Sequence, residues 1–273
     1  MAEEKFDRAA ELEGLLRQVA GQLKGSLGNI HSALERLAPV QAREGDKTLD
    51  RDAAVLQQSY YRILRLTGNL EAAALLDGPA NVVLENCDIV ALCRDLVRRA
   101  EHCAGLLELE LAFICGKDYH VIAVDRVQVE RLVLNLLSNA FKFTPAGGKI
   151  TVELRFDATV ELRVVDTGCG MGAEKLERLF DRRVRPDALE PPPHGLGLGL
   201  PICRKIALDH GGTILVTSRE GEGTMVLVSL PNRRTRQQQM TALKVDYAGG
   251  FNHVLLELAD ALPRQAFTHE YMD

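Results

Sequence analysis

Two long stretches at the start of the chain repeat apolar residues at intervals of three and four. In residues 10–38 this spacing holds with one extra four between Leu23 and Leu27, and Pro39 ends the stretch. From about Leu49 to Leu76 the alternation is strict. Such a period predicts amphipathic helices with a seam like that of a coiled coil. The polar segment VQAREGDK between them predicts a loop, so we expect a helical hairpin over residues 1–77.

A single hairpin covers only part of each apolar seam. Two copies that pair as a four-helix bundle would bury the rest. The pattern therefore predicts a homodimer that forms through residues 10–76.

The pattern changes after Asp77-Gly78-Pro79 to alternating strands and helices. Predicted strands cover residues 82–84, 107–114, 119–123, 149–156, 159–165, 213–218 and 224–230, and predicted helices cover 89–104, 126–143 and 200–208. We therefore expect an α+β protein: the hairpin, followed over residues 81–231 by an α/β sandwich with one mixed sheet and helices on one face.

The tail over residues 232–273 has a different composition. Residues 242–247 predict a strand, and a short amphipathic helix follows, with Phe251, Val254, Leu255, Leu258 and Leu262 on one face. This helix packs on its own chain, docks a partner or is disordered, and the sequence leaves all three possibilities open.

Composition excludes several classes of protein. The 273 residues are 46% hydrophobic and 26% charged, which is typical of a soluble globular chain, and the net charge of −5 argues against nucleic-acid binding. The six cysteines form no C-x-x-C pair, so we expect free thiols in a reducing cytoplasm and neither a disulfide framework nor a zinc site. No apolar run reaches about 18 residues, so we expect no membrane segment.

A polar stripe interrupts the helix predicted over residues 126–143. Asn135, Asn139 and Lys142 fall at i, i+4 and i+7 and share one face. Carboxamide oxygens suit a hard cation such as Mg²⁺, and an ammonium group suits phosphate. The alternative is an ordinary solvated face.

Two glycine-rich motifs follow. The first, Asp166–Gly172 (DTGCGMG), comes directly after a strand, where glycines let the backbone approach a ligand and the Asp can accept a hydrogen bond from an exocyclic amine. The second, Gly195–Leu200 (GLGLGL), precedes a helix and can present backbone N–H groups to phosphate, although it fits neither the P-loop nor the Rossmann pattern. Between them, Arg182–His194 is either a mobile lid or a segment of surface charge.

Four motifs, in this order along the chain, resemble those of the ATP-binding catalytic domain of sensor histidine kinases: NLLSNAFKFTP, VVDTGCGMG, HGLGLGLPICRKIALDHGG and GEGT. This family belongs to a wider set with gyrase, the Hsp90 chaperones and MutL. The resemblance implies that Asn139, with Asn135, holds Mg²⁺ and that Lys142 contacts the phosphates of ATP. It places Phe143 beside the nucleotide and Asp166 on the adenine amine. It also implies supporting or loop-forming roles for Gly168, Gly170, Gly195, Leu196, Gly197, Leu198, Gly199 and Thr224.

The hairpin departs from the family pattern. The family's first helix carries a stretch like H-E-L-R-T-P-L-x-x-I, and the matching stretch here is GQLKGSLGNI, residues 21–30. Gly21 replaces the phosphoacceptor His, Gln22 replaces the adjacent acid, and Gly25 replaces the Thr or Asn that would orient water. A neutral amide cannot act as a base, and glycine offers no nucleophile. His31, the only His on either long helix, is either a substitute phosphoacceptor or a structural side chain.

Three functions remain open at this point. The chain is a histidine-kinase-like protein of a two-component system that binds Mg-ATP without phosphorylating its own hairpin, or an autokinase that uses His31. The third possibility is a nucleotide-gated scaffold, a pseudokinase that binds a response regulator or a partner kinase without catalysis.

Overall fold

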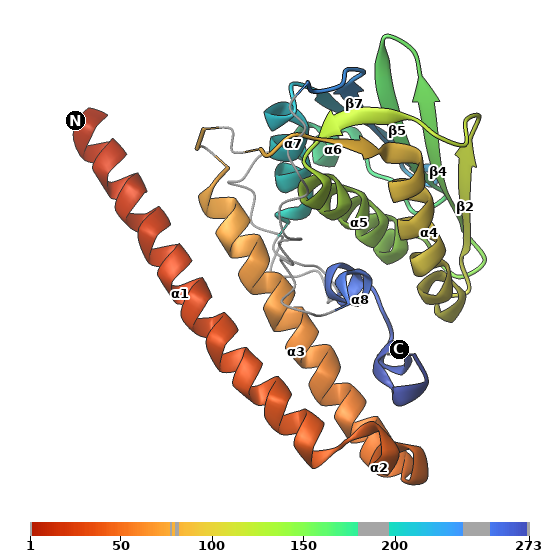
Figure 1. Ribbon diagram of the computed structural model, residues 1–273. Helices are drawn as coiled ribbons and strands as arrows, with labels where there is room; N and C mark the ends of the chain where they lie inside the picture. The colour runs from red at the N-terminus through yellow and green to blue at the C-terminus, as the bar shows by residue number, and fades with distance from the viewer. Residues whose placement is uncertain (1, 77, 80–81, 180–196, 237–251, 272–273) are drawn as a thin grey trace. The chain divides into compact units, whose positions relative to one another are not determined.

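The computed structural model describes residues 2–76, 78–79, 82–179, 197–236 and 252–271 (Figure 1). The predicted strand at 242–247 and the segment Arg182–His194 lie outside these ranges. The chain divides into two compact units. The first combines Met1–Pro79 with Pro263–Asp273, and the second is Ala80–Leu262.

The first unit is built on two long helices, α1 (Ala2–Leu37) and α3 (Lys47–Ala74), which run side by side as a hairpin (Figure 1). The side chain of Asp46 caps α3 by accepting hydrogen bonds from the backbone N–H groups of Thr48 and Leu49. Both long helices therefore form where the apolar period predicts them.

The predicted loop between these helices is wrong, because it contains a short helix, α2 (Val40–Gly45). Its Arg43 is only 2% exposed. The guanidinium donates to Asp50 Oδ1 at 2.8 Å, to Gln57 Oε1 at 3.0 Å and to the backbone oxygen of Phe267 at 3.0 Å. A buried guanidinium is tolerated when its donors are satisfied, so distant partners decide the conformation of this segment.

The end of the chain completes this buried cluster through the 3₁₀ turns η1 (Arg264–Phe267) and η2 (His269–Tyr271). The backbone N–H of His269 donates to Asp50 Oδ1 at 3.1 Å. Burial acts to raise the pKa of Asp50, but the hydrogen bonds from His269 and Arg43 outweigh it, and the pKa lies below its usual value of 3.8.

Much of the apolar seam remains exposed in the single chain. Leu23 is 40% exposed, Ile30 56%, Leu56 55% and Ile63 43%, whereas Leu27 is buried. One hairpin therefore leaves about half of the surface of these apolar residues uncovered.

The second unit contains a five-stranded mixed sheet in the order β2-β4-β5-β7-β6. Its strands are β2 (Glu110–Cys115), β4 (Lys149–Phe156), β5 (Thr159–Asp166), β6 (Thr213–Arg219) and β7 (Gly223–Pro231). Strand β2 pairs with β4 in parallel, and the other pairs are antiparallel. A separate two-stranded sheet joins β1 (Glu85–Asp88) to β3 (Val121–Val124), in addition to the single sheet predicted.

Three helices cover one face of the five-stranded sheet, as predicted: α4 (Ile89–Leu106), α5 (Arg126–Phe143) and α7 (Gly199–Asp209) (Figure 1). Alternate residues of the strands point into this layer and are buried, among them Ile150, Val152, Leu162 and Val228. A further short helix, α6 (Ala173–Glu177), was not predicted.

Two strand predictions are wrong in position. Residues 82–84 form no strand, because the pairing with β3 begins at Glu85. Strand β2 begins at Glu110, later than predicted, because α4 continues to Leu106 and Glu108 then takes a positive φ of 56°. That conformation turns the chain before the strand can begin.

The short amphipathic helix of the tail is α8 (His253–Leu258), capped by the side chain of Asn252. It packs on the chain itself, beside α5 and α4, which is one of the three possibilities left open by the sequence. None of the helices in the described part of the chain combines the length and apolar character that crossing a membrane requires.

Candidate functional site

The polar stripe of Asn135, Asn139 and Lys142 lies on helix α5. The start of this helix is fixed by Asp125, whose side chain accepts a hydrogen bond from the backbone N–H of Gln128 at 3.1 Å. Asn135 is completely buried and Asn139 is half-buried. The Asn135 amide donates to the backbone oxygen of Arg131 at 3.0 Å, which holds this carboxamide along the helix.

The second glycine motif meets this stripe at the start of α7. A Cβ atom on Gly199 would lie 3.2 Å from Asn135 Oδ1 and 3.8 Å from Asn139 Nδ2. The absence of a side chain at Gly199 thus lets the backbone of α7 approach both carboxamides. The structure therefore brings together α5, with its Asn135 and Asn139, and the end of the second glycine motif at Gly199. Gly197 and Leu198 precede this contact, whereas Gly195 and Leu196 lie outside the described residues.

The first glycine motif meets the other end of α5. The backbone N–H of Cys169 donates to the backbone oxygen of Phe143 at 3.0 Å. A Cβ atom on Gly168 would lie 2.4 Å from that same oxygen, so only glycine fits here. Gly170 has a φ of +64°, and its Cβ would collide with the backbone of Arg219. The glycine spacing therefore serves a close crossing of three backbone segments.

Asp166 stands at the end of β5, and its Oδ1 organises the loop. It accepts hydrogen bonds from the backbone N–H groups of Gly168 at 2.9 Å and Thr224 at 3.2 Å. Within the described part of the chain both bonds go to Oδ1, which leaves Oδ2 for an external donor. Burial raises the pKa of Asp166 above its usual value, although the two backbone donors act in the opposite direction.

Ser218 supports the same loop, a role that could not be predicted from the sequence. Its hydroxyl accepts from the backbone N–H of Met171 at 2.8 Å, donates to the backbone oxygen of Gly223 at 2.9 Å and lies 2.9 Å from Thr224 Oγ1. A serine in a strand is common, and only the pairing of β6 with β7 brings it under the loop.

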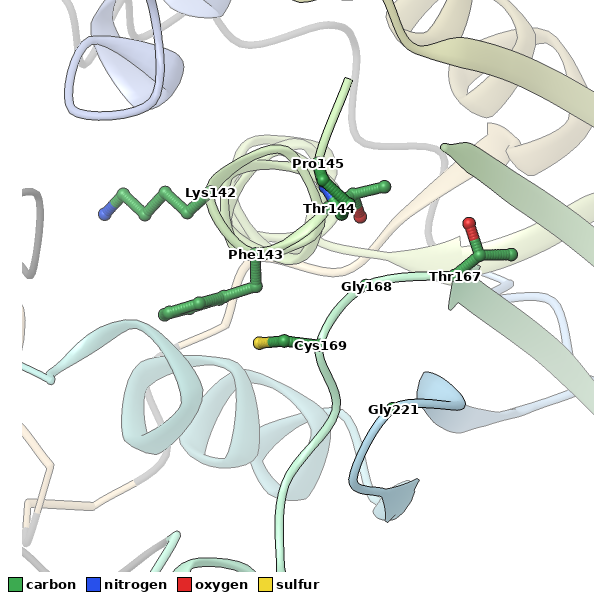
Figure 2. Close-up of a pocket in the computed structure, with 8 residues that line it drawn as sticks. All are labelled: Lys142, Phe143, Thr144, Pro145, Thr167, Gly168, Cys169 and Gly221. Atoms are coloured by element: carbon green, nitrogen blue, oxygen red, sulfur yellow. The ribbon is translucent and has the colours of Figure 1, made fainter. Parts of the chain in front are cut away.

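An open pocket of about 490 Å³ lies between the end of α5 and the first glycine motif (Figure 2). Figure 2 shows the side chains of Phe143 and Cys169 next to each other, while Lys142 leaves the helix in another direction. The residues that line the pocket are Lys142, Phe143, Thr144, Pro145, Thr167, Gly168, Cys169 and Gly221. A planar ring can stack on an aromatic side chain such as Phe143, so this pocket suits an adenine base near Asp166.

Residues 124–234 match the protein-family model described as histidine kinase-, DNA gyrase B-, and HSP90-like ATPase. This part of the chain is a histidine kinase-like ATPase domain. The adaptive-response sensory kinase SasA of Rippkaea orientalis is 30% identical over 226 residues, and the histidine protein kinase DivJ of Caulobacter vibrioides is 44% identical over 111 residues. The crystal structure of full-length ShkA in complex with AMPPNP is 25% identical with a TM-score of 0.59.

These alignments cover different shares of the proteins. They include 79% of this chain for SasA, 40% for DivJ and 79% for ShkA. The chain in turn spans 57% of SasA, 19% of DivJ and 46% of ShkA, so it is similar to parts of longer proteins.

The ATPase domain also has contacts along α5 that the sequence did not predict. Lys142 Nζ lies 3.3 Å from Asp260 Oδ2, and Asn135 Nδ2 lies 3.4 Å from Glu257 Oε2. Both carboxylates belong to the segment around α8. Thus two residues assigned by the resemblance to metal and phosphate are engaged by acidic side chains of the same chain.

The described residues contain no cluster of three or more His, Cys, Asp or Glu side chains that could hold a metal ion. Four cysteines are buried free thiols, Cys115 is half-buried and Cys169 is exposed. Burial raises the pKa of Cys87 and of Cys103 to about 11, which keeps these thiols protonated and unreactive.

Proposed function

We propose that the chain binds Mg-ATP as a histidine-kinase-like signalling protein of a two-component system, without phosphorylating its own hairpin. The contact of Gly199 with Asn135 and Asn139 carries this proposal, because it joins the stripe and the second glycine motif in one site. The adenine would occupy the pocket beside Phe143, with its amine on Asp166. The phosphates would lie toward Lys142 and the start of α7.

The donor set supports Mg²⁺ held jointly with the nucleotide. The two carboxamides carry hard oxygen ligands, and both lie close to Gly199. Mg²⁺ commonly takes few protein ligands and completes its octahedral shell with phosphate oxygens and water. Asn139, with Asn135 behind it, would therefore hold a cation that arrives with the phosphates and neutralises part of their charge.

The first helix supports the absence of phosphotransfer to the hairpin. Gly21, Gln22 and Gly25 are exposed on α1, at the positions where the family resemblance expects the phosphoacceptor and its helpers. His31 instead stacks on the ring of Tyr60, with centroids 4.8 Å apart. Burial lowers the pKa of His31, although the charge of Glu35 acts to raise it. A packed imidazole supports a structural role for His31.

The exposed seam supports a homodimer through residues 10–76, with residues 1–77 as the dimerisation unit. Ile30, Leu56 and Ile63 are each more than 40% exposed in the single chain. Exposed apolar rows at helical spacing indicate a partner surface, and a second hairpin is the simplest partner with the same geometry.

A nucleotide-gated scaffold is the second candidate. The replacement of the phosphoacceptor His and its helpers by Gly21, Gln22 and Gly25 favours it specifically. In that case Mg-ATP would set the conformation through which the dimer binds a response regulator or a partner kinase. The free buried thiols support a reducing compartment, the cytoplasm.

Incubation of the full chain with γ-labelled ATP and Mg²⁺ tests these functions, with nucleotide binding followed in parallel by calorimetry. We expect binding without acid-labile label on the protein. Label that disappears in the His31→Ala variant would establish an autokinase and overturn this part of the proposal. Absence of any nucleotide binding would overturn the whole.

A further inference from the structure

Helix α8 packs beside α5 (Figure 1), and acidic side chains of α8 and of the residues just after it contact Asn135 and Lys142 of α5. The apolar residues of α8 and of the turn after it are almost fully covered: Val254, Leu255, Leu258 and Leu262 are each at most 3% exposed. The contact is thus a packed interface within the ATPase unit.

Two acidic side chains of this segment contact α5: Glu257 is buried, and Asp260 is partly exposed. Glu257 is only 3% exposed, and its carboxylate lies 3.6 Å from Arg131 Nε and 3.4 Å from the Asn135 amide. Asp260 lies 3.3 Å from Lys142 Nζ, whose side chain is only 7% exposed. A buried carboxylate is costly unless it is paired, so these partners explain why acids are tolerated here.

The chemistry of these contacts matches that of a nucleotide phosphate chain. Anionic oxygens approach a lysine ammonium, an arginine guanidinium and a carboxamide, which are groups that also bind phosphate. A phosphate group and an acidic side chain therefore compete for the same positive partners along α5.

We propose that residues 252–262 are an intrachain competitor of Mg-ATP, in which Glu257 and Asp260 stand in for phosphate groups on α5. The inference rests on the proposed nucleotide site. Binding of Mg-ATP displaces α8, and docking of α8 lowers the apparent affinity for the nucleotide. The protein is thereby held in a self-inhibited state until the nucleotide or another event releases the tail.

The covalent link makes such a short helix an effective competitor. A helix of six residues is not stable alone in water. Joined to the domain, however, it acts at a high effective concentration that a separate peptide would not reach. The link therefore keeps α8 near its site, so that docking costs little translational entropy.

Calorimetric titration of the full chain with Mg-AMPPNP tests the proposal. The double variant Glu257→Gln and Asp260→Asn keeps the size of both side chains but removes their charges. We expect it to bind Mg-AMPPNP about fivefold or more tightly than the natural chain, which is a typical coupling between competing states. Glu270→Gln is the matched control, because Glu270 is an exposed acid of the same tail, and its affinity should not change. Equal or weaker binding by a folded double variant overturns the proposal.

Hydrogen exchange of α8 provides a second measurement. Saturating Mg-AMPPNP should speed exchange of the backbone amides of residues 253–258 in the natural chain, because displacement exposes them to water. Unchanged protection at saturation would show that nucleotide and α8 bind together, and would overturn the competition while leaving the nucleotide site intact. If neither the natural chain nor the double variant binds nucleotide, the proposed function fails and the competition fails with it.

Discussion

Gly199 lies directly against Asn135: a Cβ atom at Gly199 would come within 3.2 Å of the Asn135 side-chain oxygen. These residues are 64 positions apart in the chain (199 − 135) and belong to different motifs. Their proximity requires that α5 and α7 pack side by side on the sheet, which they do. The pair therefore links the two sequence motifs through tertiary structure.

A larger side chain at Gly199 should block the nucleotide without unfolding the domain. We expect Gly199→Val to weaken Mg-ATP binding about tenfold or more, a change of about 1.4 kcal/mol, because the branched side chain would enter the space beside both carboxamides. Gly199→Ala, which adds one atom in tight contact with Asn135 Oδ1, is the milder variant for comparison. Calorimetry gives the affinities, and circular dichroism checks that both variants fold. Natural affinity in a folded valine variant would contradict this placement of the phosphates.

Removal of the half-buried carboxamide at Asn139 should affect the magnesium complex most strongly. We expect Asn139→Ala to weaken Mg-ATP binding by about 1–3 kcal/mol, the usual cost of losing a polar partner. The same titration in EDTA separates metal from nucleotide contacts. A loss of equal size with and without Mg²⁺ would assign Asn139 to the nucleotide alone.

The ATPase sheet and its motifs were largely predictable because their determinants are local. The alternation of apolar residues in Lys149–Phe156 gives the bounds of β4, and an aspartate cap and a proline fix the ends of α5. By contrast, α2 depends on Arg43, whose partners include the backbone oxygen of Phe267, 224 residues later in the chain. Local propensity contains no information about a partner so distant.

Nucleotide affinity should depend on the ionisation of Asp166. An aspartate accepts a hydrogen bond from the adenine amine best when it is ionised, and burial raises its pKa above the usual 3.8. Protonation should therefore weaken binding as the pH falls, and should begin to do so above that value. Fluorescence titration with ATP between about pH 7 and about pH 5 measures this, with circular dichroism as a check of folding. Asp166→Asn should bind weakly at every pH, and its affinity should lack this acid-dependent loss.

Cys169 offers a chemical probe of the pocket. It is exposed and lines the pocket next to Phe143, whereas Cys87, Cys93, Cys103 and Cys203 are buried. We expect iodoacetamide to label Cys169 first and Mg-ATP to slow this labelling, because an adenine beside Phe143 would cover the thiol. Mass spectrometry of the peptides identifies the labelled residue. Cys115, which is half-buried and outside the pocket lining, is the internal control, and equal slowing at both cysteines would point to a general stabilisation.

The contacts of the tail could not be predicted, although its helix could. The spacing of apolar residues predicts a helix at α8. The same spacing would fit a helix that packs on any apolar surface, so it does not identify α5 as the partner. Glu257 and Asp260 resemble ordinary solvent-facing acids of an amphipathic helix. Their partners Asn135 and Lys142 lie more than 100 residues earlier in the chain. Only the folded arrangement reveals that the acids oppose the polar stripe of α5.

Association through the hairpin should depend on its exposed apolar row. We expect Ile63→Glu to abolish the proposed dimer and leave a monomer, because a charge would have to be buried without a partner inside the proposed four-helix bundle. Light scattering at micromolar protein concentration measures the mass. Leu215→Glu is the matched control, since Leu215 is 59% exposed on a strand of the ATPase sheet and lies outside the proposed interface. A natural chain that is monomeric under these conditions, or an Ile63→Glu variant that remains dimeric, would remove the hairpin as the site of association. Dissociation by both variants would show a general effect of added charge.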